Sequence, residues 1–322
     1  MKPVWFTELG CPAIDKGGNQ PNVFLDAKSV ENAAPYFSSR KRADSMQRRF
    51  LEAHHGYWAS SAAPSGMVDP AKIFCWTWDA RPFPAFPSDT GFWSDGGNWQ
   101  TGHWLNGRLG AGTLADTVAA ILRDHGFSAF DVSEVCGDLP GYVQGGVASA
   151  RGLIEPLMTA FQIDVNEEDG LLRFRSRLHA SRPVRQVEVF ADLEDRPLWS
   201  ESRAHDADHA GEAIIGFYDQ FLDYGEGSAR SHRVAAANDR VLRCDLPASL
   251  SRRMAEDSAE ALLRDHILAR RSVSFDIAPF DLSVQPGDAV ELPAGPPGRF
   301  LVTRIEEGRT RRVEARGFAA ST

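Results

Sequence analysis

Long hydrophobic runs are absent from this 322-residue chain, and cysteine is scarce. No stretch approaches the roughly 18 consecutive apolar residues of a membrane-spanning helix, so we expect no membrane span. The four cysteines are far apart and form no Cys-x-x-Cys pair: Cys11, Cys75, Cys136 and Cys244. This spacing argues against a zinc ribbon or an iron–sulfur cluster, and it is typical of reduced thiols in a protein made in a cytoplasm.

Positive charge is also in short supply. Lysine and arginine number 35 against 44 aspartates and glutamates, which gives a formal net charge of −9. A protein that holds DNA by its phosphates needs a basic surplus, so we expect no specific nucleic-acid binding. The acidity suits a conduit that DNA passes without sticking, and it equally serves ordinary solubility. The N-terminus lacks the charged and then apolar pattern of a signal peptide.

Two apolar runs near the N-terminus, Val4–Thr7 and Ile73–Trp78, predict buried parallel strands. The first run ends at Glu8 and the second at Asp79. The long connection between them leaves room for a crossover helix. Carboxylates at the C-terminal ends of parallel strands are where a (β/α)8 barrel has its chemistry. Two strands cannot close a barrel, so residues 1–110 are predicted to be an α/β fragment, the end of such a barrel.

Five segments have the apolar periodicity or boundary signals of helices. They cover residues 35–58, 98–109, 113–125, 148–161 and 251–270. In the first segment, the apolar stripe consists of Met46, Phe50, Ala53 and Tyr57. Thr113 is a good N-cap for the third, and Gly126 is a stop signal after it.

The character of the chain changes near residue 110 and again near residue 183. Residues 111–180 are predicted to form an α+β unit that includes an acidic turn at Asp164–Gly170 and a strand at Leu171–Arg175. Residues 181–322 are predicted to be β-rich, with one long helix and an early strand at Val187–Ala191. Short strands joined by glycine turns indicate a small antiparallel sheet or barrel in this last part.

Glu8 is the strongest candidate for catalysis. Retaining glycosidases use two carboxyl groups about 5–5.5 Å apart, one as the nucleophile and the other as the acid/base. Glu8 at a strand tip fits the nucleophile, and Asp79 is a candidate second carboxylate. The alternatives are structural: Glu8 caps a loop, and Asp79 pairs with Arg81 nearby.

Tryptophans surround these carboxylates in the sequence. Trp76, Trp78, Trp93 and Trp99 are candidates for a sugar-stacking platform. The alternative is that they fill the space between a barrel and its helices.

Residues 205–209 contain metal-ligand types, with His205 and His209 flanking two aspartates. No further ligand cluster completes a site, so we expect no bound metal. A glycine-rich phosphate loop and a nucleophile elbow are also lacking, and we expect no cofactor.

Long stretches of the chain resemble the late part of the barrel domain of gene transfer agent tail proteins. The stretches are residues 5–17 (WFTELGCPAIDKG), 67–70 (MVDP), 76–87 (WTWDARPFPAFP) and 99–110 (WQTGHWLNGRLG). Residues 139–143 (LPGYV), 150–157 (ARGLIEPL) and the turn Pro286–Asp288 resemble the phage-tail hub domain that follows in the same proteins.

The resemblance implies a large tail-tip protein, also described as a host specificity protein, of which three copies form a hub below the tail tube. Its partners would be other tail and baseplate proteins and a cell-envelope glycan. It would be assembled in the cytoplasm and then occupy the tail tip. Glu8 would fall on the seventh barrel strand, where related glycosidases have a nucleophile. Strands one to six and the usual acid/base glutamate have no counterpart here, so a truncated product, an expressed piece or a degraded prophage-like remnant is expected.

A second hypothesis is a stand-alone glycoside hydrolase or carbohydrate-binding module that acts on cell-envelope glycans. The two hypotheses differ in three expectations. On the tail hypothesis, residues 1–110 do not close a barrel, the isolated chain lacks glycosidase activity, and residues 111–322 serve assembly.

Overall fold

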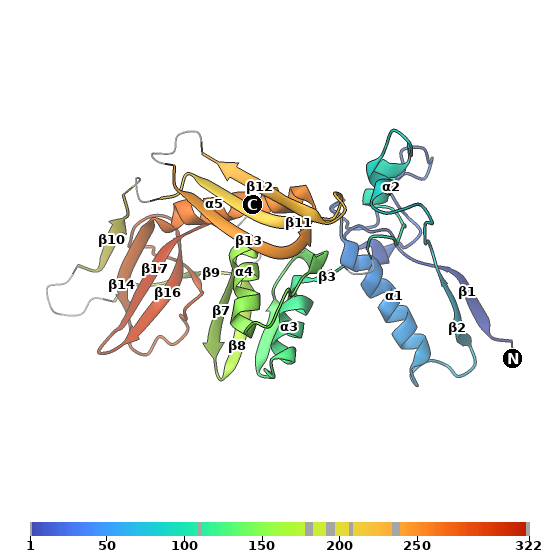
Figure 1. Ribbon diagram of the computed structural model, residues 1–322. Coiled ribbons are helices and arrows are strands. Elements are labelled where there is room, and N and C mark those ends of the chain that lie inside the picture. The colour runs from blue at the N-terminus through green and yellow to red at the C-terminus, as the bar shows by residue number, and fades with distance from the viewer. Residues whose placement is uncertain are drawn as a thin grey trace.

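The computed structural model describes residues 2–108, 111–177, 183–190, 197–205, 209–233 and 239–319. Within these residues the protein is a mixed α/β structure with several small sheets, none of which closes into a barrel. Figure 1 shows the N-terminal segment at one end of the molecule and a six-stranded sheet at the other, with helices and a four-stranded sheet between them. No described helix is both long and apolar enough to cross a membrane.

The N-terminal segment is built on one parallel pair of strands, as predicted, but the expectation that both strands are buried is wrong, because most of their residues are exposed or half-buried. The second strand also ends at Cys75, before Trp76–Trp78. The pair consists of β1 (Val4–Leu9) and β2 (Val68–Cys75), and helix α1 (Asp44–Ala59) lies between them in the sequence. A small core joins sheet and helix: Phe6, Leu9, Phe50, Leu51, Ile73 and Leu105. Gly10 is required at the end of β1, because any side chain there would collide with the carbonyl oxygen of Trp76.

The expected start of the first helix at residue 35 is wrong. Phe37 and Arg40 have φ angles of 63° and 64°, in the left-handed region, so the chain cannot be helical before α1. The expected apolar stripe is also wrong in part, because Ala53 and Tyr57 are exposed. Leu51 and the amide of Gln47 are buried instead, and Gln47 donates a hydrogen bond to the Cys11 carbonyl at 3.0 Å.

The helix expected over residues 98–109 is wrong as well. The described part of this stretch contains only the 3-10 turn η2 (Gly96–Gln100), after two other short elements, η1 (Gly17–Asn19) and α2 (Ala85–Ser88). Beyond η2, the backbone bonds to the strand-end loops: Gly102 accepts from Ala13 at 3.0 Å, and Leu105 donates to Thr77 at 3.0 Å. These long-range bonds replace the i to i−4 bonds of a helix.

Two helices and a three-stranded sheet follow. They are α3 (Leu114–Asp124), α4 (Ala150–Phe161), β4 (Phe130–Glu134), β7 (Ile163–Glu168) and β8 (Leu171–Ser176). The predicted cap is confirmed, because the Thr113 hydroxyl accepts from the Asp116 amide at 3.0 Å. The acidic turn is shorter than expected: β7 continues to Glu168, and the turn is Asp169–Gly170. Asp164, Glu167 and Glu168, which were expected in a loop, belong to strand β7 instead.

A four-stranded sheet shares one hydrophobic core with these helices. Its order is β12 (Gly225–His232), β11 (Glu212–Asp219), β13 (Val241–Leu250) and β6 (Gly141–Tyr142). The long helix α5 (Arg252–Ala269) begins at the Ser251 cap and packs on this sheet through Ala255 and Ala259. The short pair β3 (Gly112–Thr113) and β5 (Asp138–Leu139) lies beside α1.

The C-terminal part is an open, mainly antiparallel sheet of six strands. Its order is β10 (Trp199–Arg203), β14 (Arg271–Ile277), β17 (Arg311–Phe318), β16 (Arg299–Glu307), β15 (Ala289–Glu291) and β9 (Val184–Gln186). The strand expected at Val187–Ala191 is wrong in position, since β9 ends before it, and Ala191 lies outside the described residues. The strands of residues 271–318 follow the alternation that the sequence predicts, with Phe275, Phe300 and Val313 in a second core.

Candidate functional site

Glu8 lies on β1, one residue before the strand ends, and it is exposed to solvent. Its side chain makes no hydrogen bond or ion pair with any described residue. A nucleophile of the retaining kind needs a second carboxyl group about 5 Å away. Among the described residues, no hydrogen bond or ion pair joins a second carboxyl group to Glu8, so its role as a nucleophile stays a prediction.

Asp79 is already paired. It accepts hydrogen bonds from the Arg81 guanidinium, with Nε at 2.8 Å, and Arg81 also binds Asp95 at 2.8 Å. These bonds, above all the side-chain bond from Arg81, hold the pKa of Asp79 below its ordinary range. The Arg81 guanidinium lies 3.6 Å from the centre of the Phe86 ring. The Asp79–Arg81 pairing, stated above as an alternative, is confirmed, and it leaves Asp79 ionised and poorly suited to donate a proton.

The four tryptophans have three different surroundings. Trp76 and Trp78 follow β2 and are exposed, at 47% and 63%. Trp93 is half-buried and packs edge-on against Phe86, with ring centroids 6.0 Å apart. Trp99 is completely buried, so its ring offers no face to a sugar. The structure therefore does not place the four side chains on one platform.

Trp99 is instead the centre of the joint between the N-terminal segment and the rest of the chain. Its ring stacks on Phe83 at 5.7 Å and meets Phe221 edge-on at 5.9 Å. Two guanidinium groups lie near it, Arg42 at 4.3 Å and Arg108 at 3.7 Å from the ring centre. Phe221 comes from the turn between β11 and β12, which no sequence prediction covered. The one local signal is a large apolar side chain inside a hairpin turn, where polar residues are usual.

Polar contacts strengthen this joint along α1. The Ser45 hydroxyl donates to Asp138 at 2.7 Å, and Arg49 forms an ion pair with Asp116 at 3.5 Å. Both partners lie beyond residue 110, so the N-terminal segment is attached to the following domain by apolar, cation–π and ionic contacts together.

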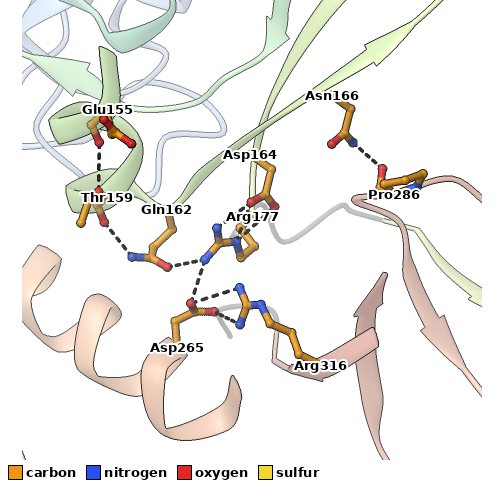
Figure 2. A network of polar contacts seen from close by, with 9 residues as sticks. All are labelled: Glu155, Thr159, Gln162, Asp164, Asn166, Arg177, Asp265, Pro286 and Arg316. Atoms are coloured by element: carbon orange, nitrogen blue, oxygen red, sulfur yellow. Dashed lines mark hydrogen bonds and ion pairs between the residues drawn. The ribbon is translucent and has the colours of Figure 1, made fainter. Parts of the chain in front are cut away.

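A second polar network holds the three parts of residues 111–319 together (Figure 2). Arg177, just after β8, donates to Asp164 of β7 at 2.6 Å and to Asp265 of α5 at 2.7 Å. Asp265 also accepts two bonds from Arg316 of β17, at 3.1 and 3.2 Å. Burial by itself would lower the pKa of Arg177, but the bonds to Asp164 and the charge of Asp265 outweigh it and raise that pKa. Asn166 of β7 also donates a hydrogen bond to the Pro286 carbonyl, which lies just before β15 of the six-stranded sheet.

The histidine cluster lies only partly within the described residues, because 206–208 fall outside them. His209 Nδ1 lies 3.3 Å from His266 Nε2 on α5. Across the part of the chain that the structure describes, no group of three His, Cys, Asp or Glu side chains is arranged to hold a metal ion.

Family comparisons divide the chain into two matched segments. Residues 1–87 match the family described as "GTA TIM-barrel-like domain", and residues 149–307 match the family described as "Putative phage tail protein". The chain is thus similar to a GTA TIM-barrel-like domain in its first part and to a phage tail protein in its later part. The resemblance that the sequence motifs indicated is thereby confirmed. No curated protein matches the chain.

The structure is similar to a protein of the "Virion of native gene transfer agent (GTA) particle", with a TM-score of 0.64 and 29% identity. That match covers 70% of this chain, and the chain spans about half, 52%, of that protein. Looser similarities are to the 43 kDa tail protein of prophage MuSo2 from Shewanella oneidensis (12% identity, TM-score 0.41, covering 65% and 67% of the two chains). Another is to the tail protein from Neisseria meningitidis MC58, with 12% identity and a TM-score of 0.43. That match covers 64% of this chain and 66% of the tail protein.

Proposed function

We propose that the chain is a structural component of a phage-like tail and forms part of a hub at the tail tip or baseplate. The similarity to the gene transfer agent virion protein carries this proposal, because it combines 29% identity with a TM-score of 0.64. The phage tail family match over residues 149–307 supports it independently. Its partners are then other tail proteins, with assembly in the cytoplasm before the particle is complete.

Open strand edges suggest how copies of the chain associate. β12 is an edge strand of the four-stranded sheet, and β10 and β9 are the two edges of the six-stranded sheet. Unpaired strand edges must be covered or paired, and a cyclic assembly covers them between copies. We propose three copies in the ring, as in the tail hubs that the sequence resembles.

Hydrogen exchange combined with sedimentation tests this assembly. As the concentration rises through the micromolar range, we expect a trimer to form and the outward amides of β12 to become protected. The amides of β11 serve as the internal control, because β11 lies between β12 and β13 and is paired on both sides at every concentration. A monomer up to about 100 μM with unchanged exchange on β9, β10 and β12 would contradict the ring, since assembly interfaces of this kind bury large areas.

We also propose that any glycosidase chemistry at Glu8 requires a carboxyl group from outside this chain. Glu8 is exposed and makes no hydrogen bond or ion pair with the described residues, and Asp79, the candidate second carboxylate, is bonded to Arg81. Incubation with a panel of aryl glycosides and with peptidoglycan should give no hydrolysis by the isolated chain. Hydrolysis that disappears in the variant Glu8→Gln would instead favour the stand-alone enzyme, for which the exposed rings of Trp76 and Trp78 supply a glycan contact.

A further inference from the structure

A pocket of about 180 Å³ lies at the joint between the N-terminal segment and the domain that follows. Trp78 and Arg108 line it from the N-terminal side, and Gln220, Tyr224 and Ser249 line it from the other. The pocket exists only because the two parts of the chain pack together. No sequence motif indicated it.

Arg108 is the unusual member of this lining. The side chain is 1% exposed, yet none of its three guanidinium nitrogens has a hydrogen-bond partner among the residues that the structure describes. Its only ion pair in the described residues is with Asp44, at 3.4 Å. Asp44 already accepts two shorter bonds from Arg42, at 2.7 and 2.8 Å. Two arginines therefore share one carboxylate, which compensates the positive charge of Arg108 only in part.

A buried charge without full compensation is costly, by several kcal/mol in typical proteins. The pKa of Arg108 reflects this cost, since burial lowers it to about 9 against the opposing attraction of Asp44. The Trp99 ring, 3.7 Å away, supplies a cation–π contact but no hydrogen bond. An anion in the pocket would supply the missing negative charge.

Ser249 provides a second, independent observation at the same place. It lies on β13, is 6% exposed, and its hydroxyl also lacks a hydrogen-bond partner. Buried polar groups are normally bonded, so two unpartnered groups in the wall of one pocket point to a missing ligand. Gln220, 2% exposed, adds an amide to the same wall.

The remaining lining residues indicate what else the ligand contains. Trp78 is 63% exposed and Tyr224 is 51% exposed, and both line the pocket together with Arg108. Two aromatic rings are therefore accessible to a ligand beside the buried cation. Aromatic faces suit the apolar face of a ring, and a tyrosine hydroxyl adds a hydrogen-bonding group. The volume of about 180 Å³ is smaller than the roughly 300–1,000 Å³ of drug-sized sites and fits one small ring.

We propose that this pocket binds one acidic sugar unit, a ring that carries a single carboxylate. The carboxylate is attracted by Arg108 and bonds to polar groups of the wall, while Trp78 and Tyr224 contact the ring. Binding needs one folded copy of the chain, so it is independent of the ring assembly proposed above.

Calorimetric titration of the full chain with three small probes tests the ligand chemistry. Glucuronate carries both the ring and the carboxylate, glucose carries the ring alone, and acetate carries the carboxylate alone. We expect glucuronate to bind at least about tenfold more tightly than either, because charged hydrogen bonds and ring contacts both contribute. If glucose binds as tightly as glucuronate, the carboxylate plays no role in binding. If acetate binds as tightly as glucuronate, the sugar ring plays no role. Absence of glucuronate binding at millimolar concentration would overturn the site.

Variants test its location. Trp78→Ala removes an exposed ring and should weaken glucuronate binding by about tenfold. Trp5→Ala is the matched control, because Trp5 is 53% exposed but does not line the pocket, and it should leave binding unchanged. Arg108→Met should abolish the preference for glucuronate over glucose, and its circular dichroism and melting curve establish that it folds. Equal loss in both tryptophan variants, or a preference that survives in folded Arg108→Met, would overturn the assignment.

Discussion

Two arginines at buried positions show how differently the two regions of this protein treat charge. Arg177, in the region after residue 110, is surrounded by Asp164, Gln162 and Asp265, all within 2.8 Å. Arg108, in the N-terminal segment, is even more buried, and its guanidinium has no hydrogen bond to any described residue. The first arginine ties three structural units together. The second has only one ion pair and no hydrogen bond to its guanidinium among the described residues.

Apolar packing shows the same contrast. Beyond residue 110, α3, α4, α5 and the four-stranded sheet share one extensive core, and the six-stranded sheet has a core of its own. In the N-terminal segment, the parallel pair β1–β2 leaves Trp5 and Phe74 53% and 49% exposed. Parallel strands are usually covered on both faces. The later region thus compensates the charge of the arginine that joins its units, whereas the N-terminal segment leaves much of its strand pair exposed and the Arg108 guanidinium without a hydrogen bond among the described residues.

The largest effect should come from removing the shared carboxylate of the complete region. Asp265→Ala leaves Arg177 and Arg316 without their common partner, and we expect a loss of about 3–5 kcal/mol in the free energy of unfolding. Urea denaturation measures the loss, and hydrogen exchange locates it in α5 and β17. A change below about 1 kcal/mol would mean that the network is not what unites these units.

The joint should respond next most strongly. Trp99→Ala removes a fully buried ring and should cost about 3 kcal/mol, with the N-terminal segment becoming sensitive to limited proteolysis before the rest. The exposed Trp5→Ala is the control and should change little. Unaltered protease resistance in Trp99→Ala would show that polar contacts such as Ser45–Asp138 suffice to hold the segment.

A direct comparison of the two arginines should give opposite results. Arg108→Met should change the free energy of unfolding by less than about 1 kcal/mol, because Asp44 keeps its two bonds to Arg42 and a costly charge is removed. Arg177→Met should destabilise by more than about 3 kcal/mol, because it leaves Asp164 without its partner. Equal losses in the two variants would break the distinction between the regions.

The smallest effect concerns Asp79. Its folded-state pKa is depressed below the ordinary 3.8, mainly by the bond from Arg81, so its contribution to stability is present above that value. The contribution is lost as the pH falls through the depressed pKa. Asp79→Asn should therefore be less stable than the natural chain by under about 1 kcal/mol at neutral pH, and the difference should vanish in acid. Acid titration of both chains by circular dichroism measures it; a difference that grows in acid would contradict the pairing.

Sequence patterns predicted the elements whose signals are local. The start of α3 at Thr113 and the end of that helix before Gly126 need only neighbouring residues, and both are as expected. The alternating strands after residue 270 are also as expected. The helix expected over 98–109 failed because its backbone bonds to Thr77 and Ala13, contacts that no local pattern contains.

The sequence by itself determined which two families the chain resembles. It also determined the helix caps, the strand alternation and the parallel pairing of β1 with β2. The tertiary structure alone decided the environment of each candidate side chain. It buried Trp99 against Phe221, paired Asp79 with Arg81, left Glu8 without a partner, and placed Arg108 beside Ser249. The reason is physical: caps and alternation depend on adjacent residues, whereas burial and charge compensation depend on segments that meet only after both have folded.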